Sequence, residues 1–202
     1  QIDGTTLQTL TTRMGGEHDY QPDWSPTGQR IAFLTTRFGS SSLAVLDVET
    51  GEINQARDTS SLEDPSWSPD GERLIAWDEG FFDGILEGRL YEIDPASDGP
   101  PTVLLRDPGG FRDPSWIENG RSVLYRTLRS SVNRLFVQNL AQMKPREIGP
   151  LMARIHPALS PDGSTLAFVG RSGSKGIWLA EFGPVPSSVR PTTWATVKRS
   201  RE

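Results

Sequence analysis

A motif that recurs four times limits the possible folds of this chain more strongly than anything else in its sequence. Each copy begins with Pro and ends with Gly, and three of the four contain a Trp between them. The copies follow one another at a spacing of roughly 40–50 residues, a period typical of repeat architectures. The four copies are Pro22–Gly28, Pro65–Gly71, Pro114–Gly120 and Pro157–Gly163.

The end of the motif predicts a tight turn between two strands. In Ser68–Gly71, Ser suits the first position of a type I turn, Pro the second and Gly the fourth. Two short apolar runs follow each motif, and a weaker run comes after them, as at 52–55 and 102–105. Short runs rich in β-branched and aromatic residues predict strands. The stronger runs are Ile31–Phe33, Leu43–Leu46, Leu74–Trp77, Leu90–Ile93, Val123–Tyr125, Leu135–Val137, Leu166–Phe168 and Ile177–Leu179.

Each repeat is therefore predicted to be a four-stranded antiparallel meander, and the repeats to pack as blades of an all-β propeller. One such sheet cannot bury both faces alone, so neighbouring repeats supply the missing contacts. The content of 20 Gly and 16 Pro agrees with many turns. We expect blades over residues 1–185, with the last strand of a preceding or closing blade in 1–15 (Thr6–Thr11), repeats over 16–60, 61–108, 109–152 and 153–185, and a basic tail over 186–202.

The Trp before each turn is large and apolar, which suits a side chain wedged between neighbouring sheets. We therefore predict that Trp24, Trp67 and Trp116 are buried. The fourth copy has Leu159 in place of Trp. The structural positions of the repeat are Pro22, Trp24, Pro65, Trp67, Pro114, Trp116, Pro157 and Leu159.

The pattern Pro-x-Trp-Ser-Pro-Asp-Gly-x-x-Ile-Ala-Phe closely resembles the TolB-type propeller repeat, a WD-like bacterial repeat. The resemblance covers residues 3–182, although the third copy replaces Ser-Pro-Asp with Ile117–Asn119. It implies a binding scaffold associated with the cell envelope, in the periplasm or another extracytoplasmic place, with a protein partner. Propellers of this family usually have six or more blades. Four motifs therefore imply a fragment of a larger propeller, further blades too diverged to see, or an unusually small ring, and of these we favour the fragment.

Polar residues precede each motif Pro, where an antiparallel blade brings them to the mouth of the central channel. Three interpretations stay open for them: capping of loop N–H groups, a polar mouth that binds a partner, or a metal or catalytic site. No dense spacing of metal ligands occurs, so we predict no metal and no cofactor. Loops after the second strand are expected on the same side, and they carry Arg37, Phe38, Arg129 and Arg171. The family resemblance implies that the three arginines form structural ion pairs with nearby acids, with anion binding as the alternative. The predicted mouth residues are His18, Asp19, Asp64, Asp113 and His156, with Gln21 beside them.

The second repeat carries an insertion, Asp78–Gly88, which contains three glycines and reads as a loop. Exposed apolar side chains on a mobile loop mark a contact surface. The alternative is that they fold back over the blade edge. The predicted partner-contact residues are Phe81, Phe82, Ile85 and Leu86.

Other sequence features narrow the function. There is no Cys, and no apolar run approaches the ~18 residues of a membrane span. The net charge of −5 disfavours nucleic acid as the main partner. Gly170–Ser174 lacks the final Gly of a nucleophile elbow, so we predict that the chain is not an enzyme. Two alternatives stay open: the substrate-gating propeller of a prolyl-oligopeptidase-like peptidase, and a sensor domain of a kinase or transcription regulator. The oligomeric state is left open.

Overall fold

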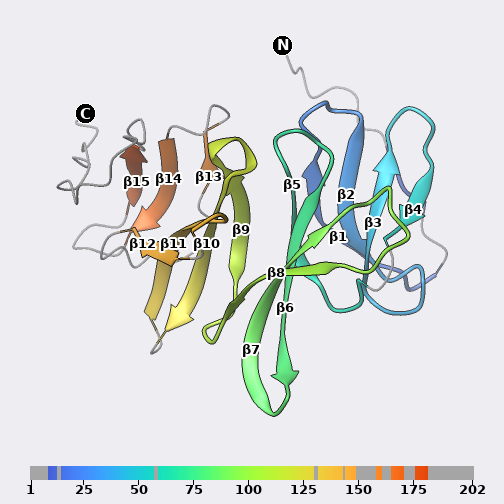
Figure 1. Ribbon diagram of the computed structural model, residues 1–202. Helices are drawn as coiled ribbons and strands as arrows, with labels where there is room; N and C mark the ends of the chain where they lie inside the picture. Colours follow the sequence, from blue (N-terminus) through green and yellow to red (C-terminus); the bar gives the residue numbers. More distant parts are fainter. Residues whose placement is uncertain are drawn as a thin grey trace. The chain divides into compact units, whose positions relative to one another are not determined.

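The computed structural model describes residues 9–12, 15–56, 59–129, 132–142, 144–148, 158–160, 165–170 and 176–181 (Figure 1). Within these ranges the chain consists of strands and turns, with one 3-10 segment at Glu118–Gly120. No helix there is long and apolar enough to cross a membrane. The chain divides into two compact units. Unit one comprises residues 1–78 and 89–106, and unit two comprises residues 79–88 and 107–202.

The first two sheets are four-stranded antiparallel meanders, as predicted. Strands β2 and β3 pair in continuous register from Arg30–Asp47 to Thr35–Ser42. In each sheet the strands lie side by side in chain order. The first sheet contains β1 (Asp19–Trp24), β2 (Arg30–Thr35), β3 (Ser42–Asp47) and β4 (Ile53–Gln55), and the second contains β5 (Glu63–Trp67), β6 (Leu74–Phe82), β7 (Ile85–Ile93) and β8 (Thr102–Asp107).

The predicted turn of the motif is confirmed in the first two copies. The Gly28 N–H donates to the Ser25 carbonyl at 2.9 Å, and the Gly71 N–H donates to the Ser68 carbonyl at 2.8 Å. Both glycines have φ near the left-handed region, at 71° and 73°, where a side chain would be strained. The Ser68 hydroxyl also accepts from the Arg73 N–H at 2.9 Å. Ser, Pro and Gly therefore occupy the positions that the turn requires.

Apolar strands of the first two sheets form one shared core. Alternate residues of a strand point to opposite faces, so one face of β2 and β3 can pack on the second sheet while the other face forms a separate cluster. The shared core contains Ala32, Leu34, Leu43, Val45, Ala56, Leu62, Trp67, Leu74, Ala76 and Ile93. The cluster on the other face contains Ile31, Phe33, Ala44 and Leu46.

Side chains of β1 and β2 also bond to the main chain of the second sheet. The Asp23 carboxylate accepts from the Trp67 N–H at 2.8 Å. The Arg30 guanidinium donates to the Gly71 carbonyl at 2.6 Å, and it lies over the Trp67 ring, 4.7 Å from the ring centroid. These contacts place Trp67 between the two sheets, as predicted.

Unit two contains the third and fourth sheets. Leu166 of the fourth sheet packs with Ile117 and Leu124 of the third in a common core. Phe111, Tyr125 and Phe136 form a further aromatic row, with centroids 4.8 and 5.8 Å apart. The third sheet contains β9 (Arg112–Ile117), β10 (Ser122–Arg129), β11 (Val132–Asn139) and β12 (Lys144–Glu147), and the described part of the fourth contains β13 (Ala158–Leu159), β14 (Thr165–Gly170) and β15 (Gly176–Glu181).

The expectation that all three Trp residues are buried is wrong for one of them. Trp67 and Trp116 are each 5% exposed, but Trp24 is 54% exposed. Trp67 is covered by the sheet that precedes its own. Trp24 belongs to the first sheet, and no described strand of unit one precedes that sheet. For Trp67, burial therefore depends on the preceding sheet as well as on the motif.

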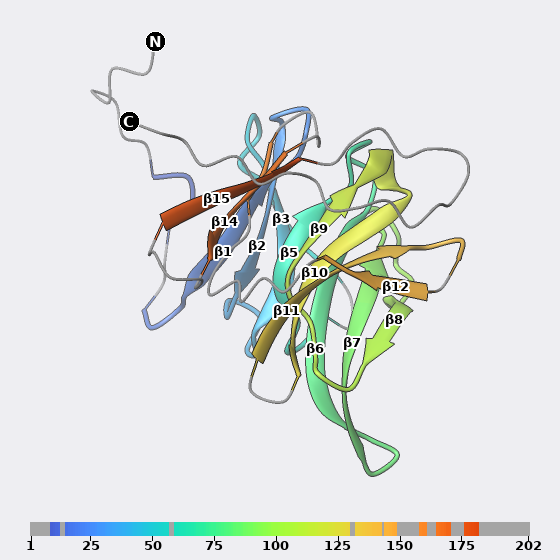
Figure 2. The same cartoon turned by 90° about the vertical axis from the view of Figure 1, so that its left-hand side faces the viewer.

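The structure also corrects the expected loop over Asp78–Gly88. Strands β6 and β7 continue through this segment as a hairpin that runs on past β5 and β8, as both views show (Figures 1 and 2). Only Asp83 and Gly84 form the turn, with φ of 52° and 78°. Two successive residues with positive φ are typical of a type I′ hairpin turn, for which Asp-Gly is a strong sequence signal.

Other predictions fall wholly or partly outside the described ranges, among them Arg171 and the basic tail over 186–202. Thr9–Thr11, the described part of the expected strand over Thr6–Thr11, is in no strand. Pro157 lies outside the described residues, and Leu159 is described only as part of the β13 backbone.

Candidate functional site

Three predicted positions at the ends of motif strands share an unusual backbone conformation. Gln21, Asp64 and Asp113 each stand immediately before a motif Pro, with φ of 51°, 49° and 49°. A non-Gly residue in this region is strained by roughly 1–2 kcal/mol. The strand pairing shifts register at each of these points. The repeat therefore contains a β-bulge that re-aims one polar side chain in each of three sheets.

In unit one, the bulge residues of the first and second sheets bind each other. The Gln21 side-chain N–H donates to Asp64 Oδ1 at 2.8 Å, and Gln21 Oε1 accepts from the Asp64 main-chain N–H at 3.0 Å. The second oxygen of Asp64 accepts from Trp77 Nε1 at 2.9 Å. Both carboxylate oxygens of Asp64 thus have partners, and the predicted mouth residue here joins two sheets.

In unit two, the corresponding carboxylate forms an ion pair. Asp113 Oδ2 lies 2.8 Å from Arg126 Nε, and the two side chains are only 10% and 15% exposed. Arg126 also donates to Asn133 Oδ1 at 2.7 Å. His156 lies outside the described residues, so a cluster of Asp64, Asp113 and His156 stays a prediction.

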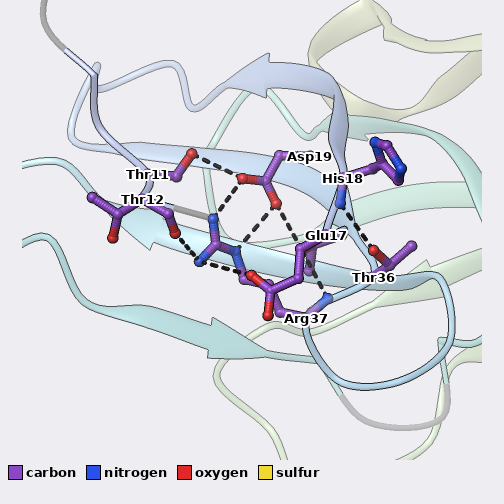
Figure 3. Close-up of polar contacts among 8 residues, drawn as sticks. Thr11, Thr12, Glu17, His18, Asp19, Thr36 and Arg37 are labelled. Atoms are coloured by element: carbon purple, nitrogen blue, oxygen red, sulfur yellow. Dashed lines mark hydrogen bonds and ion pairs between the residues drawn. The ribbon is translucent and has the colours of Figure 1, made fainter. Parts of the chain in front are cut away.

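Asp19 lies at the centre of a polar network in the first sheet (Figure 3). Arg37 approaches its carboxylate with two nitrogens, at 2.7 and 3.2 Å. Hydroxyl groups of Thr35 and Thr11 donate to the same carboxylate at 2.7 and 2.8 Å. The Arg37 hydrogen bond, aided by the hydroxyl donors, lowers the pKa of Asp19 to about 2. The structural ion pair predicted for Arg37 is confirmed.

His18 takes part in the neighbouring strand pairing through its main chain. Its N–H donates to the Thr36 hydroxyl at 2.9 Å, and its carbonyl accepts from the Thr36 N–H. Its ring points away from Asp19 and Arg37 (Figure 3). In the described part of the chain, no three His, Asp or Glu side chains are grouped as metal ligands would be.

Asp23 is a half-buried acidic residue that was not among the predicted site residues. Burial raises the pKa of its carboxyl group, although the Trp67 N–H bond opposes the shift. The motif itself could have pointed to Asp23. The residue after the motif Pro is small in the other three copies, which have Ser66, Ser115 and Ala158 there. A charged residue at a position otherwise filled by small side chains indicates a repeat-specific role.

The base of the β6–β7 hairpin is held against the start of the third sheet within unit two. Glu79 Oε2 lies 2.9 Å from Arg112 Nη2. Gly88 packs so closely on the turn before β9 that a Cβ atom there would lie 2.4 Å from the Cα of Gly110. We call this contact the hairpin base. Because both close-packed positions are glycines, the two main chains can meet without a side chain between them.

The end of the hairpin is apolar and exposed. Phe81 is 76% exposed, Ile85 66% and Leu86 46%, while the Phe82 ring is half-buried over Gly80. These four are the predicted partner-contact residues, and they lie on two paired strands and not in the predicted loop. We call the segment 81–86 the hairpin tip. It combines a large exposed apolar surface with a strand backbone and a closely packed base.

Comparisons with known proteins agree with this architecture. Residues 1–182 match the family model described as the TolB beta propeller domain, which confirms the predicted propeller fold. The Tol-Pal system protein TolB of Francisella tularensis is 25% identical over 179 residues, covering 85% of this chain and 40% of that protein. The uncharacterized peptidase YuxL of Bacillus subtilis is 35% identical over 157 residues, covering 76% of this chain and 22% of that protein.

A solved structure shows the same fold. The crystal structure of TolB from Acinetobacter baumannii superposes with a TM-score of 0.73 at 19% identity, covering 89% of this chain and 44% of that one. The chain thus spans about 40% of the length of the TolB proteins that it matches.

Proposed function

Because the chain belongs to the family of TolB β-propeller domains, we propose that it is a non-catalytic module that binds a protein partner through its hairpin tip. The observation that carries the proposal is the exposure of Phe81, Ile85 and Leu86 above a closely packed base. Apolar side chains grouped in water are unfavourable to expose, and such groups are typical of contact surfaces.

The relatives support a partner in the cell envelope. The Francisella protein is named as a member of the Tol-Pal system, and by analogy we place this chain in the periplasm or another extracytoplasmic compartment. The net charge of −5 favours a protein over nucleic acid as the partner. The proposed function requires no cofactor and no metal.

We assign the mouth acids to holding strands and sheets together. Asp19, Asp64 and Asp113 each accept hydrogen bonds from side chains of the same unit. A carboxylate with such partners would lose them on binding a ligand, which costs free energy. His18 and His156 stay proposed as contact residues of the mouth.

Site-specific photo-crosslinking in intact cells tests the proposed function. The full chain carries a photoreactive phenylalanine at Phe81, and a matched variant carries it at Glu49, which is exposed in the β3–β4 turn. We expect a protein adduct of one defined mass from position 81 and none from position 49. Equal labelling at both positions, or no adduct at position 81, contradicts the proposal.

A second candidate function is supported by the similarity to YuxL. This relative is 35% identical and is named as a peptidase, which fits a propeller that gates substrate access to a catalytic domain. A Gly-x-Ser-x-Gly elbow in the same coding sequence, with peptidase activity of the full-length product, would favour this function. Loss of substrate size selectivity on removing the propeller would then assign the gating role.

A further inference from the structure

The hairpin tip exposes apolar side chains on both of its faces. A two-residue turn at Asp83-Gly84 places Phe82 opposite Ile85, and therefore Phe81 opposite Leu86. Directly opposite residues share a face, and successive residues alternate between faces. Phe81 and Leu86 thus form one apolar face, and Phe82 and Ile85 form the other. The contact between Phe82 and Gly80, two residues earlier on the same face, agrees with this assignment.

An apolar ribbon with two exposed faces does not suit a flat binding surface. A flat partner would cover one face and leave either Phe81 or Ile85, at 76% and 66% exposed, in water. Burial of a large apolar side chain is favourable, so a side chain left in water is a loss of binding free energy. Covering both faces therefore requires a partner with walls on two sides.

The charge of the hairpin tip favours a protein over a lipid bilayer as its binding partner. Asp83 stands at the apex of the turn and is exposed, so it would enter first and deepest. A carboxylate is unfavourable inside the hydrocarbon region, and the tip carries no Lys or Arg to attract anionic lipid headgroups. In a protein cleft, a cationic group at the floor compensates the same carboxylate.

The hairpin base makes the tip a preformed element. Gly88 meets the main chain of Gly110 directly, and Glu79 is bound to Arg112. These contacts lie on the two strands just below the apolar residues. Little ordering of the strands is therefore needed on binding, which favours insertion into a cleft of matching width.

We infer that the hairpin tip inserts edge-on into a cleft of a protein partner, with apolar walls against both faces and a basic group at the floor that receives Asp83. The inference rests on the proposed protein-binding function and adds the shape and chemistry of the partner's site. The main support for this inference is that the hairpin tip combines two apolar faces with one carboxylate, Asp83, at its apex.

Two-position crosslinking of the full chain in cells tests this geometry. The photoreactive residue is placed at Phe81 in one variant and at Ile85 in another, so that each reports on one face. We expect both variants to give adducts of the same partner, identified by peptide mass fingerprints. An adduct from position 81 alone would overturn the cleft while leaving the proposed function standing. The absence of adducts at both positions would overturn both.

A charge reversal tests the floor of the cleft. Asp83→Lys is expected to lower the adduct yield at both positions about tenfold, the effect of a lost ion pair of ordinary strength. Glu72→Lys, at an exposed turn residue of the second sheet, is the matched control and should leave the yield unchanged. An unchanged yield with Asp83→Lys would overturn the basic floor.

Two measurements on the purified chain test whether the hairpin tip instead binds a lipid bilayer or a second copy of the chain. Co-sedimentation with vesicles of phosphatidylethanolamine and phosphatidylglycerol is expected to leave the chain in the supernatant. Sedimentation velocity is expected to give the same species for wild type and Phe81→Ser. Vesicle binding that requires Phe81, or a self-associated species that Phe81→Ser abolishes, would overturn the inference.

Discussion

At the scale of single residues, ion pairing and burial act on two acids of β1 in opposite directions. Arg37 and hydroxyl donors hold the pKa of Asp19 at about 2, below its usual value. Burial between sheets raises the pKa of Asp23. Asp19 therefore stabilises the folded chain when ionised, while the charge on Asp23 opposes folding. Only Asp19 was predicted as a site residue, because it lies among the polar residues just before the first motif Pro.

The Asp19 network predicts a specific loss of stability in acid. Its folded pKa lies below the unfolded value of about 3.9, so its contribution is complete above pH ~4 and is lost as the pH falls toward 2. A shift of this size corresponds to about 2 kcal/mol of unfolding free energy at neutral pH. Urea unfolding of wild type and Asp19→Asn at several pH values measures it. We expect the two stabilities to converge below pH 3, and a constant difference would contradict this account.

The motif tryptophans predict unequal costs of the same substitution. Trp67 is 5% exposed between two sheets, so Trp67→Ala should lower the unfolding free energy by about 3–5 kcal/mol. Trp24 is 54% exposed, and Trp24→Ala should cost less than about 1 kcal/mol. Chemical denaturation of both variants gives the comparison. Equal losses would show that the exposed ring is covered in solution.

At the scale of elements, the sequence predicted the strands and turns whose conformation depends on residue types close together in the chain. Ser-Pro-Asp-Gly predicted the turn at Ser68–Gly71 because each residue type suits one backbone position. The hairpin at Phe82–Ile85 was missed because three glycines suggested a loop. Its signal was the Asp83-Gly84 pair, whose significance depends on apolar residues at both sides. The bulges at Gln21, Asp64 and Asp113 carried no comparable signal, since none of these residues is Gly.

The hairpin base predicts a strong effect at one glycine and a weak effect at another. A Cβ at Gly88 would lie 2.4 Å from the Gly110 Cα, so Gly88→Ala must displace main chain. A Cβ at Gly80 would lie 3.5 Å from the Phe82 ring, which is ordinary van der Waals contact, so Gly80→Ala is accommodated. We expect Gly88→Ala to expose the hairpin to limited proteolysis and to lower stability by about 1–3 kcal/mol, the range for overpacking. Similar protection of both variants would contradict the close packing.

At the scale of the whole molecule, the repeat predicted the propeller fold, because its period and strand content recur in register. It did not predict the exposure of Trp24, which depends on what precedes a sheet. Nor did it predict the polar contacts between sheets, since Asp23 and Arg30 bond to residues more than forty positions away. Long-range partners of this kind follow from the stacking and not from local sequence.

Contacts between the first two sheets predict a local effect of losing one guanidinium. Arg30 bonds to the Gly71 carbonyl and lies over Trp67, so Arg30→Ala should cost about 1–2 kcal/mol. Arg146→Ala, at an exposed residue of β12, is the control. Hydrogen exchange is expected to accelerate in β5 and β6 for Arg30→Ala only. Uniform acceleration across both units would argue against a local junction.

The main-chain hydrogen bonds between these two sheets all run in one direction, and this bears on how such repeats can diverge. Reaching side chains of the earlier sheet bond to receiving main-chain atoms of the later sheet, which every amino acid except Pro supplies in full. These bonds therefore do not depend on the side chain at the receiving position, whereas a substitution at a reaching position removes them. The side chains of Asp64 and Trp67 add contacts of their own, so this independence is confined to the main-chain bonds. The reaching groups are Gln21, Asp23 and Arg30, and the receiving atoms are the N–H groups of Asp64 and Trp67 and the carbonyl of Gly71.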